Sequence, residues 1–313
     1  MLKRLRYARL ARKESEHWAK LADLQEQGMS WLHSPTVEAF VNGRISGHGD
    51  VNWFGHIVNE HLASREPGPG MSLGCNDGVF DRQIMQAGLC TRFDGYDLSK
   101  KAVRRAQEVA TKEGLDIRYH ECDLNFPEFA HPEDHYALVV AVMSLHHVDH
   151  LEELYAKIAR AMKPGGLFAI NEYIGPNRFQ HSDRQLEVLN DLLETLPDRL
   201  RKRCHDGKIQ KRIKRVREKA LIRETPFEAI RSEEILPLLE KDFTIVERKD
   251  YGGSILGWLL NYLVPNFDET NDDDRCILSL LCQLDFLWTR PEDGEIPSDF
   301  TVIVATPKHG GEA

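Results

Sequence analysis

The stretch Met71–Phe80 reads MSLGCNDGVF and joins a short apolar segment to an amphipathic one. Gly74 and Gly78 allow the backbone to turn sharply and to approach a ligand without a Cβ in the way. A helix that begins after such a turn directs its free amide groups into the same space. The sequence therefore predicts a strand, a glycine-rich binding turn and a helix in this order.

Two acidic residues follow at positions that suit a nucleoside ligand. Asp97 ends the next expected strand in GYDLS, nineteen residues beyond Gly78, where an acidic side chain accepts hydrogen bonds from both ribose hydroxyls. Asp123 stands in CDLN after the third strand and is placed to accept from an adenine amino group, although aspartate also caps turns. The turn and Asp97 together predict an adenosine-type ligand at the carboxyl edge of a doubly wound sheet.

Short apolar segments alternate with amphipathic ones after the break REPGPG at residues 65–70, which predicts a parallel sheet flanked by helices. The predicted fold class is α/β, with a doubly wound, mostly parallel seven-stranded sheet. Core helices are expected to begin at Asp81, Lys100 and His150. The expected strands are 71–73, 92–96, 117–121, 137–143, 167–173, 243–250 and 300–306.

The same pattern divides the chain into four segments. Residues 1–66 are expected to form a helical prefix, residues 67–175 the α/β core, and residues 176–242 a helical insertion. Residues 243–309 carry the last strands, with a second helical insertion at about 253–298, because so long a connection needs structure of its own. We expect the prefix and the insertions to cover the carboxyl edge as a lid. Apolar positions with helical spacing in the prefix include Leu5, Leu10, Trp18 and Leu21.

The motifs between Met71 and about Gly175 resemble those of the class I S-adenosylmethionine-dependent methyltransferases. LGCNDG is similar to the family's glycine-rich first motif, GYDLS to its ribose-binding motif and CDLN to its adenine-binding motif, while VVAVMSLHHV and KPGGLFAINEY are similar to its later strands. The resemblance implies a Rossmann-like methyltransferase fold with S-adenosyl-L-methionine as cofactor. The cofactor-binding residues that it implies are Gly74, Cys75, Asn76, Gly78, Asp97, Leu98, Asp123, Leu124, Met143 and Ser144.

Two positions depart from the family's pattern, and NAD is an alternative cofactor. Ser72 stands where the family has an acidic residue, and Asn76 stands in place of the middle glycine. Asparagine tolerates the left-handed backbone, so the turn can still form. NAD is the competing ligand for a glycine-rich turn followed by an acidic residue. Asp77 would repel its pyrophosphate but suits the sulfonium cation, which favours S-adenosylmethionine.

Two histidines follow the fourth expected strand, where the base of a methyl transfer is needed. The reaction requires an aligned nucleophile and, for a hydroxyl acceptor, removal of its proton. His146 and His147 stand at the exit of this strand, and imidazole titrates in the range that suits a base. We favour His147, with packing beneath the next helix as the alternative for either residue. No metal is expected at HHVDH, since a turn that enters a helix does not direct the side chains of His147, Asp149 and His150 to one point.

The exit of the fifth expected strand carries candidate substrate residues. Tyr173 and Arg178 lie in EYIGPNR, and the arginine guanidinium suits a carboxylate or phosphate group. The alternative is that Arg178 pairs with Glu172 and holds the inserted helices.

Composition limits the partners and the location of the protein. The 313 residues carry a net charge of −9, which disfavours nucleic acid overall, although a basic stretch at 201–223, expected to be helical, leaves RNA methylation open. No apolar stretch reaches the roughly 20 residues of a membrane span, and the start lacks a secretory signal, so we expect a cytoplasmic protein. The six cysteines show no paired spacing and are expected to be reduced.

The function predicted from the sequence is transfer of a methyl group from S-adenosylmethionine to a small or medium acceptor. A hydroxyl group in a glycan or secondary-metabolite pathway is the expected target. An RNA methyltransferase and a non-catalytic S-adenosylmethionine-binding protein are the alternatives. No oligomeric state follows from the sequence.

Overall fold

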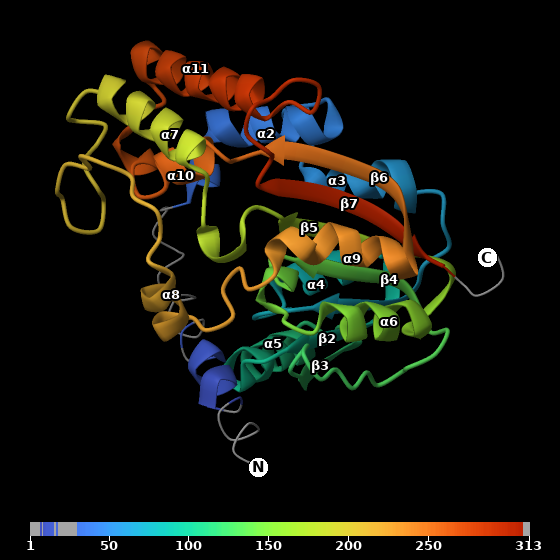
Figure 1. The fold of residues 1–313 in the computed structure, drawn as a ribbon. Coiled ribbons are helices and arrows are strands. Elements are labelled where there is room, and N and C mark those ends of the chain that lie inside the picture. Colours follow the sequence, from blue (N-terminus) through green and yellow to red (C-terminus); the bar gives the residue numbers. More distant parts are fainter. Residues whose placement is uncertain (1–6, 8, 16, 18–29, 309–313) are drawn as a thin grey trace.

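A seven-stranded sheet runs through the centre of the molecule (Figure 1). The computed structural model describes residue 7, residues 9–15, residue 17 and residues 30–308. The expected helical positions Leu5, Trp18 and Leu21 lie outside the described residues. The strands are β1 (Gly68–Leu73), β2 (Cys90–Asp97), β3 (Ile117–Glu121), β4 (Tyr136–Val142), β5 (Met162–Tyr173), β6 (Phe243–Gly252) and β7 (Phe300–Pro307).

The sheet has the order β3-β2-β1-β4-β5-β7-β6. The pairs from β3 to β5 are parallel, while β7 runs antiparallel to both β5 and β6. Because the order reverses between β1 and β4, the carboxyl ends of these two strands flank a crevice where α/β proteins bind ligands. The predicted fold class, a doubly wound and mostly parallel sheet, is confirmed.

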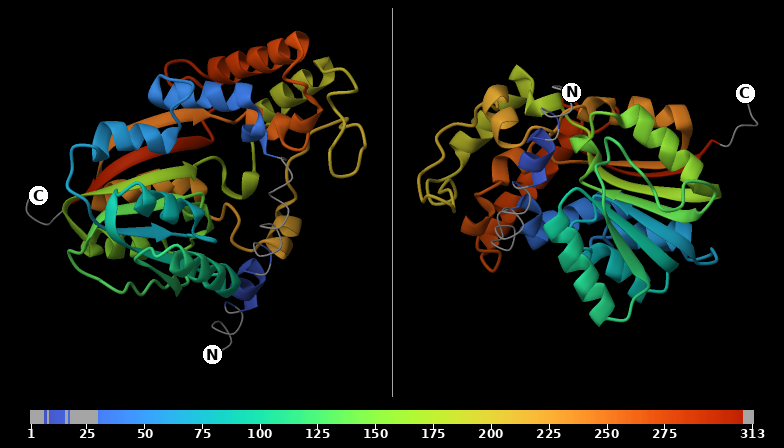
Figure 2. Two further views of the ribbon diagram at one scale, coloured as in Figure 1. Left: turned by 180° about the vertical axis from the view of Figure 1, so that it is seen from behind. Right: turned by 90° about the horizontal axis from the view of Figure 1, so that it is seen from below.

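Helices cover both faces of the sheet (Figure 2). One face packs against α2, α3, α4 and α5, and the other against α6 and α9. Along β4, Leu138 and Val140 face the first group while Val139 and Ala141 face the second, so every residue of this stretch is buried. The helices are α2 (Pro35–Ser46), α3 (Trp53–Ile57), α4 (Val79–Gln86), α5 (Lys100–Lys112), α6 (Leu151–Ala161), α7 (Asp183–Thr195), α8 (Glu218–Glu224), α9 (Ile235–Asp242), α10 (Leu256–Leu260) and α11 (Asp272–Thr289).

Several short helical turns complete the element list. They are the 3-10 turns η2 (Trp31–His33), η4 (Leu145–His147), η5 (Asn177–Phe179), η6 (Ser232–Glu234) and η7 (Val264–Asn266), and the π-helical turn η3 (Val58–Leu62). Ser99 caps α5 as its position predicts, with its side chain accepting from the Ala102 amide. The helix after the glycine-rich turn begins at Val79, slightly before the expected Asp81.

Elements from both ends of the chain lie beyond the carboxyl ends of the parallel strands. The described residues 7, 9–15 and 17, which we call the N-terminal segment, lie beside α8 in Figures 1 and 2. Helices α7, α10 and α11 pack with α2 near the end of β6. The division into four segments, with a lid made of the prefix and insertions, stays a prediction.

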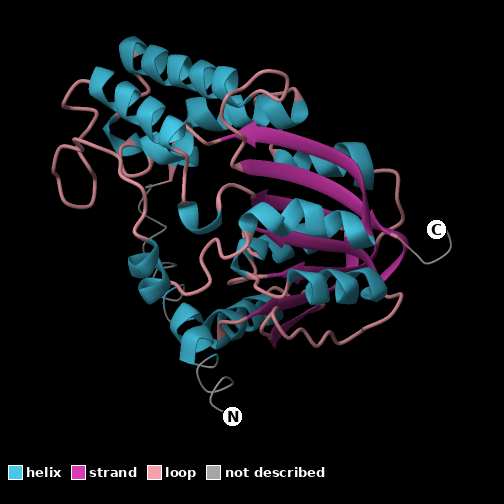
Figure 3. Cartoon of the chain, in the orientation of Figure 1, coloured by secondary structure: helices cyan, strands magenta, loops and turns pink. Residues whose placement is uncertain are grey.

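The basic stretch 201–223 is not the helix that we expected. Turns and extended backbone make up most of it, and only the last residues belong to α8 (Figure 3). Some of its arginines form ion pairs with acidic neighbours: Arg201 contacts Asp198, and Arg203 contacts Asp206. Such local pairing holds these side chains within the loop and lowers the net positive charge available to a phosphate backbone.

Among the described residues, no helix combines the length and the apolar character that a membrane span requires.

Candidate active site

The glycine-rich turn after β1 is held by the neighbouring strand. The amides of Gly74 and Cys75 both donate to the Tyr96 carbonyl on β2, at 2.8 and 3.0 Å. Gly74, Asn76 and Gly78 have positive φ values of 73°, 49° and 71°. Asn76 thus adopts the left-handed conformation that we expected it to tolerate in place of glycine.

Space as well as conformation requires glycine at two positions of this turn. A Cβ on Gly74 would lie 2.5 Å from the Cβ of Ser144, and one on Gly78 would lie 2.1 Å from the Tyr119 hydroxyl oxygen. Gly78 therefore supports the turn by close packing, while Gly74 brings the β1 turn against the end of β4.

Asp97 joins the turn to the start of α5. Its Oδ2 accepts from the Asn76 amide at 2.9 Å, and its Oδ1 accepts from the Ser99 amide at 2.7 Å. Burial raises the pKa of Asp97, although these two amides oppose the rise. A carboxylate has further lone pairs beyond those used here, so Asp97 can still accept from a bound diol.

Asp123 connects the end of β3 to the N-terminal segment. Its Oδ1 accepts from the Asn125 amide at 3.0 Å, which is the turn-capping role that was the alternative reading of this residue. Its Oδ2 accepts from the Tyr7 hydroxyl at 2.8 Å. The Tyr7 ring also packs on Phe126 and Phe227, with ring centroids 5.0 and 5.5 Å apart. The N-terminal segment is thus held against Asp123.

These elements enclose one cleft of roughly 1120 Å³, open solvent at its mouth included. Of the residues predicted from sequence, the cleft is lined by Gly74, Asn76, Asp97, Leu98, Asp123, Leu124, Ser144 and His147. The predicted residues that do not line it are Cys75, Gly78, Met143, His146, Tyr173 and Arg178.

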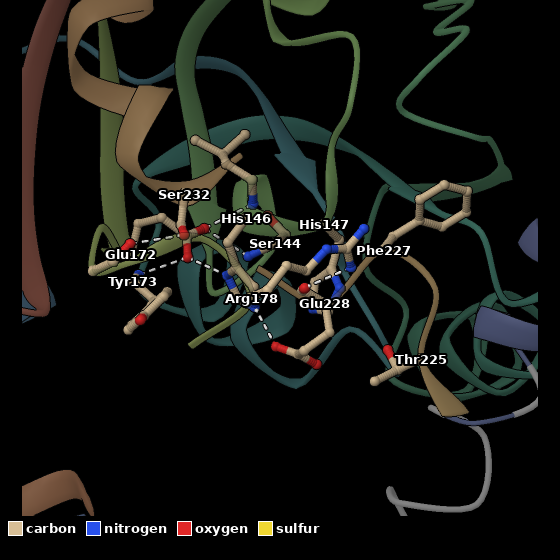
Figure 4. A network of polar contacts seen from close by, with 12 residues as sticks. Ser144, His146, His147, Glu172, Tyr173, Arg178, Thr225, Phe227, Glu228 and Ser232 are labelled. Carbon is tan, nitrogen blue, oxygen red and sulfur yellow. Dashed lines mark hydrogen bonds and ion pairs between the residues drawn. The ribbon is translucent and has the colours of Figure 1, made fainter. Parts of the chain in front are cut away.

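A buried glutamate organises the turn after β4 (Figure 4). The Oε2 of Glu172 accepts from the amides of Ser144 and Leu145 at 2.8 and 2.7 Å, and its Oε1 accepts from the Tyr173 amide at 2.7 Å. The same Oε1 pairs with His146 Nδ1. Glu172 is fully buried, so it fixes the backbone of the turn that presents Ser144 and His147 to the cleft.

His146 lies between two carboxylates. Its Nε2 is 3.4 Å from Glu228 Oε1, while its Nδ1 contacts Glu172. Burial by itself would lower the pKa of His146, but the two glutamates raise it to about 10. The ring is therefore protonated at neutral pH and cannot take up a further proton.

His147 differs from His146 because it lines the cleft. Its Nδ1 lies 3.1 Å from Oε1 of Glu14 in the N-terminal segment. Glu14 also accepts from the Thr225 hydroxyl at 2.7 Å and the Phe227 amide at 3.1 Å. Burial opposes ionisation of Glu14, yet His147, Thr225 and Phe227 lower its pKa to about 2. An ionised carboxylate at Nδ1 orients the imidazole ring of His147.

Comparison with known proteins agrees with this geometry. A family model described as a methyltransferase domain matches residues 71–166, which run from β1 into β5. The chain carries a class I methyltransferase domain.

Sterol methyltransferases are among the curated relatives of this methyltransferase domain. A sterol 24-C-methyltransferase of Gibberella zeae is 28% identical over 130 residues, which cover 40% of this chain and 34% of that protein. One from Aspergillus fumigatus is 26% identical over 187 residues, covering 58% of this chain and 46% of that protein. The chain thus spans about a third to a half of the length of these relatives.

A solved structure extends the likeness of fold beyond the domain. The geranyl diphosphate C-methyltransferase of Streptomyces coelicolor, solved with Mg²⁺, geranyl diphosphate and S-adenosyl-L-homocysteine, aligns with a TM-score of 0.51. The alignment covers 80% of this chain and 77% of that one, at 12% sequence identity.

Several predicted residues support the methyltransferase domain from outside the cleft. The Cys75 side chain packs against the hydrophobic core. Met143 has a φ of 50°, is 41% exposed and donates its amide to Asn171. Tyr173 is buried and donates its hydroxyl to the Pro176 carbonyl at 3.1 Å.

Arg178 is held by the segment that carries Glu228. Its Nη1 donates to the Glu228 carbonyl at 2.8 Å, and its amide donates to the Ala229 carbonyl at 2.7 Å. These contacts resemble the alternative of a residue that holds the insertion, although the partner is Glu228 rather than Glu172.

Sequence reasoning missed the cleft residues that come from distant segments. Nothing in the spacing of the chain connects Glu14 or Phe227 to the motifs after the strands. Asn125 could have been predicted as a cleft residue, since it is the last residue of the CDLN motif. The lining residues not predicted as site residues are Glu14, Ser15, Asp77, Ser99, Lys101, Ala102, Arg105, Asn125, Val148 and Phe227.

A buried carboxylate stands close to the position where Ser72 replaces the family's acidic residue. Ser72 pairs with Gly95 across β1 and β2, and a Cβ on Gly95 would lie 3.0 Å from Asp81 Oδ2 on α4. Burial raises the pKa of Asp81 to about 7. The carboxyl group absent from β1 is thus supplied to the same neighbourhood by the next helix.

Proposed function

We propose that this protein transfers the methyl group of S-adenosylmethionine to a small or medium acceptor, with His147 as the base. The methyltransferase domain and the cleft residues Asp97 and Asp123 support the cofactor. The observation that carries the proposal is that His147 lines the same cleft as these carboxylates while Glu14 contacts its Nδ1. A cofactor and a proton acceptor then meet in one enclosed space.

The chain's own residues would bind the cofactor and align the acceptor. Asp97 would accept from the ribose hydroxyls, and Asp123 from the adenine amino group. The N-terminal segment would exclude water from the cleft, since Tyr7 contacts Asp123 and Glu14 contacts His147. S-adenosylmethionine, when bound, supplies an electrophilic methyl group, and its transfer needs an aligned nucleophile more than covalent help from the protein.

The charges at the acceptor end favour an uncharged or cationic acceptor. Glu14 and Glu228 are both buried carboxylates beside His147, and both pKa values are lowered despite burial because the histidines lie close. An acceptor phosphate or carboxylate would be repelled there. We therefore propose a neutral hydroxyl acceptor of the glycan or secondary-metabolite type, which His147 deprotonates as the methyl group arrives.

Methyl transfer to carbon is the second candidate, because the sterol 24-C-methyltransferases and the geranyl diphosphate C-methyltransferase that the chain resembles are named for methylating carbon. In that reaction the base would remove a proton after the transfer rather than during it. The ¹³C chemical shift of the methyl group in the product separates the two outcomes, since a methyl on oxygen and one on carbon resonate far apart.

The cofactor part of the proposal is tested by calorimetry with S-adenosylmethionine, S-adenosylhomocysteine and NAD. Asp97→Asn removes a charged acceptor with little change of shape and should weaken S-adenosylhomocysteine binding about 10- to 100-fold. Asp116→Asn changes an exposed aspartate that precedes β3, at the opposite end of the strands from Asp97; it is the control and should bind normally. Binding of NAD alone would refute the assignment.

The catalytic part is tested with methyl-labelled S-adenosylmethionine and a small-molecule extract of the source cells. His147→Asn should reduce label transfer by about 10²–10⁴-fold while cofactor affinity stays unchanged. Glu14→Gln should lower kcat more than it raises the acceptor KM, and Glu14→Asp should restore part of the rate. No transfer by the native protein to any extract component, despite cofactor binding, would favour the non-catalytic alternative.

A further inference from the structure

Two histidines and a glutamate converge on the side of the molecule where α3 packs against the sheet, away from the cleft. His56 Nε2 and His61 Nε2 lie 3.0 and 2.8 Å from the same oxygen, Oε2 of Glu247 on β6. The three side chains are sheltered, with exposed fractions of 9%, 17% and 23%. One ligand atom from each residue lies within 4.8 Å of the other two.

An irregular helical turn is what brings the two histidines together. Residues five apart on an α-helix point about 140° away from each other. Here α3 passes directly into the π-helical turn η3, in which the Ala63 amide donates to the Val58 carbonyl five residues earlier at 2.8 Å. The wider turn places His56 and His61 on one side of the helix. Such π-turns are rare and occur frequently at functional sites.

A second irregularity turns the glutamate toward the histidines. Ile245 pairs with Ala305, but Glu247 pairs with Val304, so Val246 is an extra residue that forms a β-bulge. Without the bulge, Glu247 would share the face of Ile245, because residues two apart on a strand point the same way. With it, Glu247 shares the face of Val304, which is the face that Ile57 and α3 cover. Bulges commonly re-aim a side chain in this way.

We propose that His56, His61 and Glu247 form a binding site for a divalent transition-metal ion of the zinc class. Two imidazole nitrogens and one carboxylate oxygen are a common ligand set for zinc, with water as the fourth ligand. Ligand atoms on a tetrahedral zinc ion lie about 3.3 Å apart, which is close to the 3.0 and 2.8 Å that separate the two Nε2 atoms from Oε2 of Glu247. The two Nε2 atoms would give their lone pairs to the metal, with the protons on Nδ1.

The neighbours of the cluster are consistent with an ion held at one oxygen. Lys249 Nζ lies 3.2 Å from Oε1 of Glu247, which leaves Oε2 to the histidines. The metal would join the π-turn after α3 to β6, the edge strand of the sheet. It would therefore stabilise the packing of the prefix helices on this edge, independently of any reaction in the cleft.

The site is tested by titrating chelator-treated protein with Zn²⁺ and with Co²⁺. We expect one high-affinity ion per chain, a Co²⁺ absorption band without thiolate charge transfer, and a Tm that rises with added Zn²⁺. His61→Asn and Glu247→Gln should each weaken binding by more than about tenfold and abolish the rise in Tm. Circular dichroism would establish that both variants are folded.

Two controls separate this cluster from other candidate ligands. His205→Asn changes an exposed histidine and should leave metal binding intact. His147→Asn changes the His146, His147 and Glu228 group, which is the other set of ligand atoms within 4.8 Å in the described part of the chain, and should also leave it intact. The proposal is overturned if the native protein binds no Zn²⁺, if binding survives in His61→Asn, or if a thiolate band places the ion on cysteine.

Discussion

Asp81 allows a direct test of how the burial of a carboxyl group makes the stability of this domain depend on pH, because Asp81→Asn removes the charge without changing the shape of the side chain. The side chain is 1% exposed, and its Oδ2 has no hydrogen-bond partner among the described residues. Burial raises the pKa of Asp81 from 3.8 to about 7, although Ser72 and Arg82 oppose the rise. The folded protein therefore binds a proton at this site more tightly than the unfolded chain does.

The sign of the effect follows from linkage. A pKa raised on folding makes the protein lose stability as the pH rises from the unfolded value toward the folded one. The total penalty above pH 7 is about 4 kcal/mol, since one pKa unit corresponds to about 1.4 kcal/mol. Because asparagine is neutral throughout, the stability of Asp81→Asn relative to the native protein should increase by about 2–3 kcal/mol between pH 5 and pH 8.

Urea unfolding at several pH values, followed by circular dichroism, measures this difference. Asp116→Asn serves as the control at an exposed carboxylate, and its stability relative to the native protein should change little with pH. A difference between Asp81→Asn and the native protein that stays constant from pH 5 to pH 8 would refute the reasoning, as would one that shrinks as the pH rises.

Three further substitutions probe the site and its supports. Gly78→Ala places a Cβ 2.1 Å from the Tyr119 hydroxyl at a φ of 71°; it should destabilise the fold by roughly 2–5 kcal/mol and abolish cofactor binding in calorimetry, so normal binding would contradict it. Tyr7→Phe removes the 2.8 Å hydrogen bond to Asp123 but keeps the ring; trypsin should cut the N-terminal segment about tenfold faster, and an unchanged rate would mean that this bond does not hold it. Asp285→Ala leaves three buried amides without their acceptor. The free energy of unfolding, measured by thermal unfolding, should fall by about 3 kcal/mol or more, and a fall below about 1 kcal/mol would show that water replaces the carboxylate.

The alternation of strands and helices was predictable because burial in a parallel sheet demands continuous apolar runs. The stretch from Tyr136 to Val142 is buried on both faces, and its continuous apolar run is typical of a central strand in a parallel sheet. The helix predicted at residues 201–223 is wrong except for its last residues, which belong to α8. There the arginines pair with nearby aspartates in a loop, and such pairing does not depend on helical periodicity.

The turn residues of the cleft were also within reach of the sequence, because they directly follow predicted strands. Gly74, Asp97, Asp123 and His147 meet at one edge since parallel strands bring their carboxyl ends together. His146 shows the limit of this argument. It is adjacent to His147, yet a 3-10 turn and two glutamates direct its ring away from the cleft.

The sheet, the glycine-rich turn and the carboxylates that follow its strands could be predicted from the sequence, because they depend on local periodicity and on the regular geometry of parallel strands. Three features emerge only when the chain folds: Glu14 contacts His147, Tyr7 contacts Asp123, and a π-turn and a β-bulge direct the side chains of His56, His61 and Glu247 to one point. Each of these contacts joins segments far apart in the chain, and their meeting depends on how whole elements pack rather than on any local pattern.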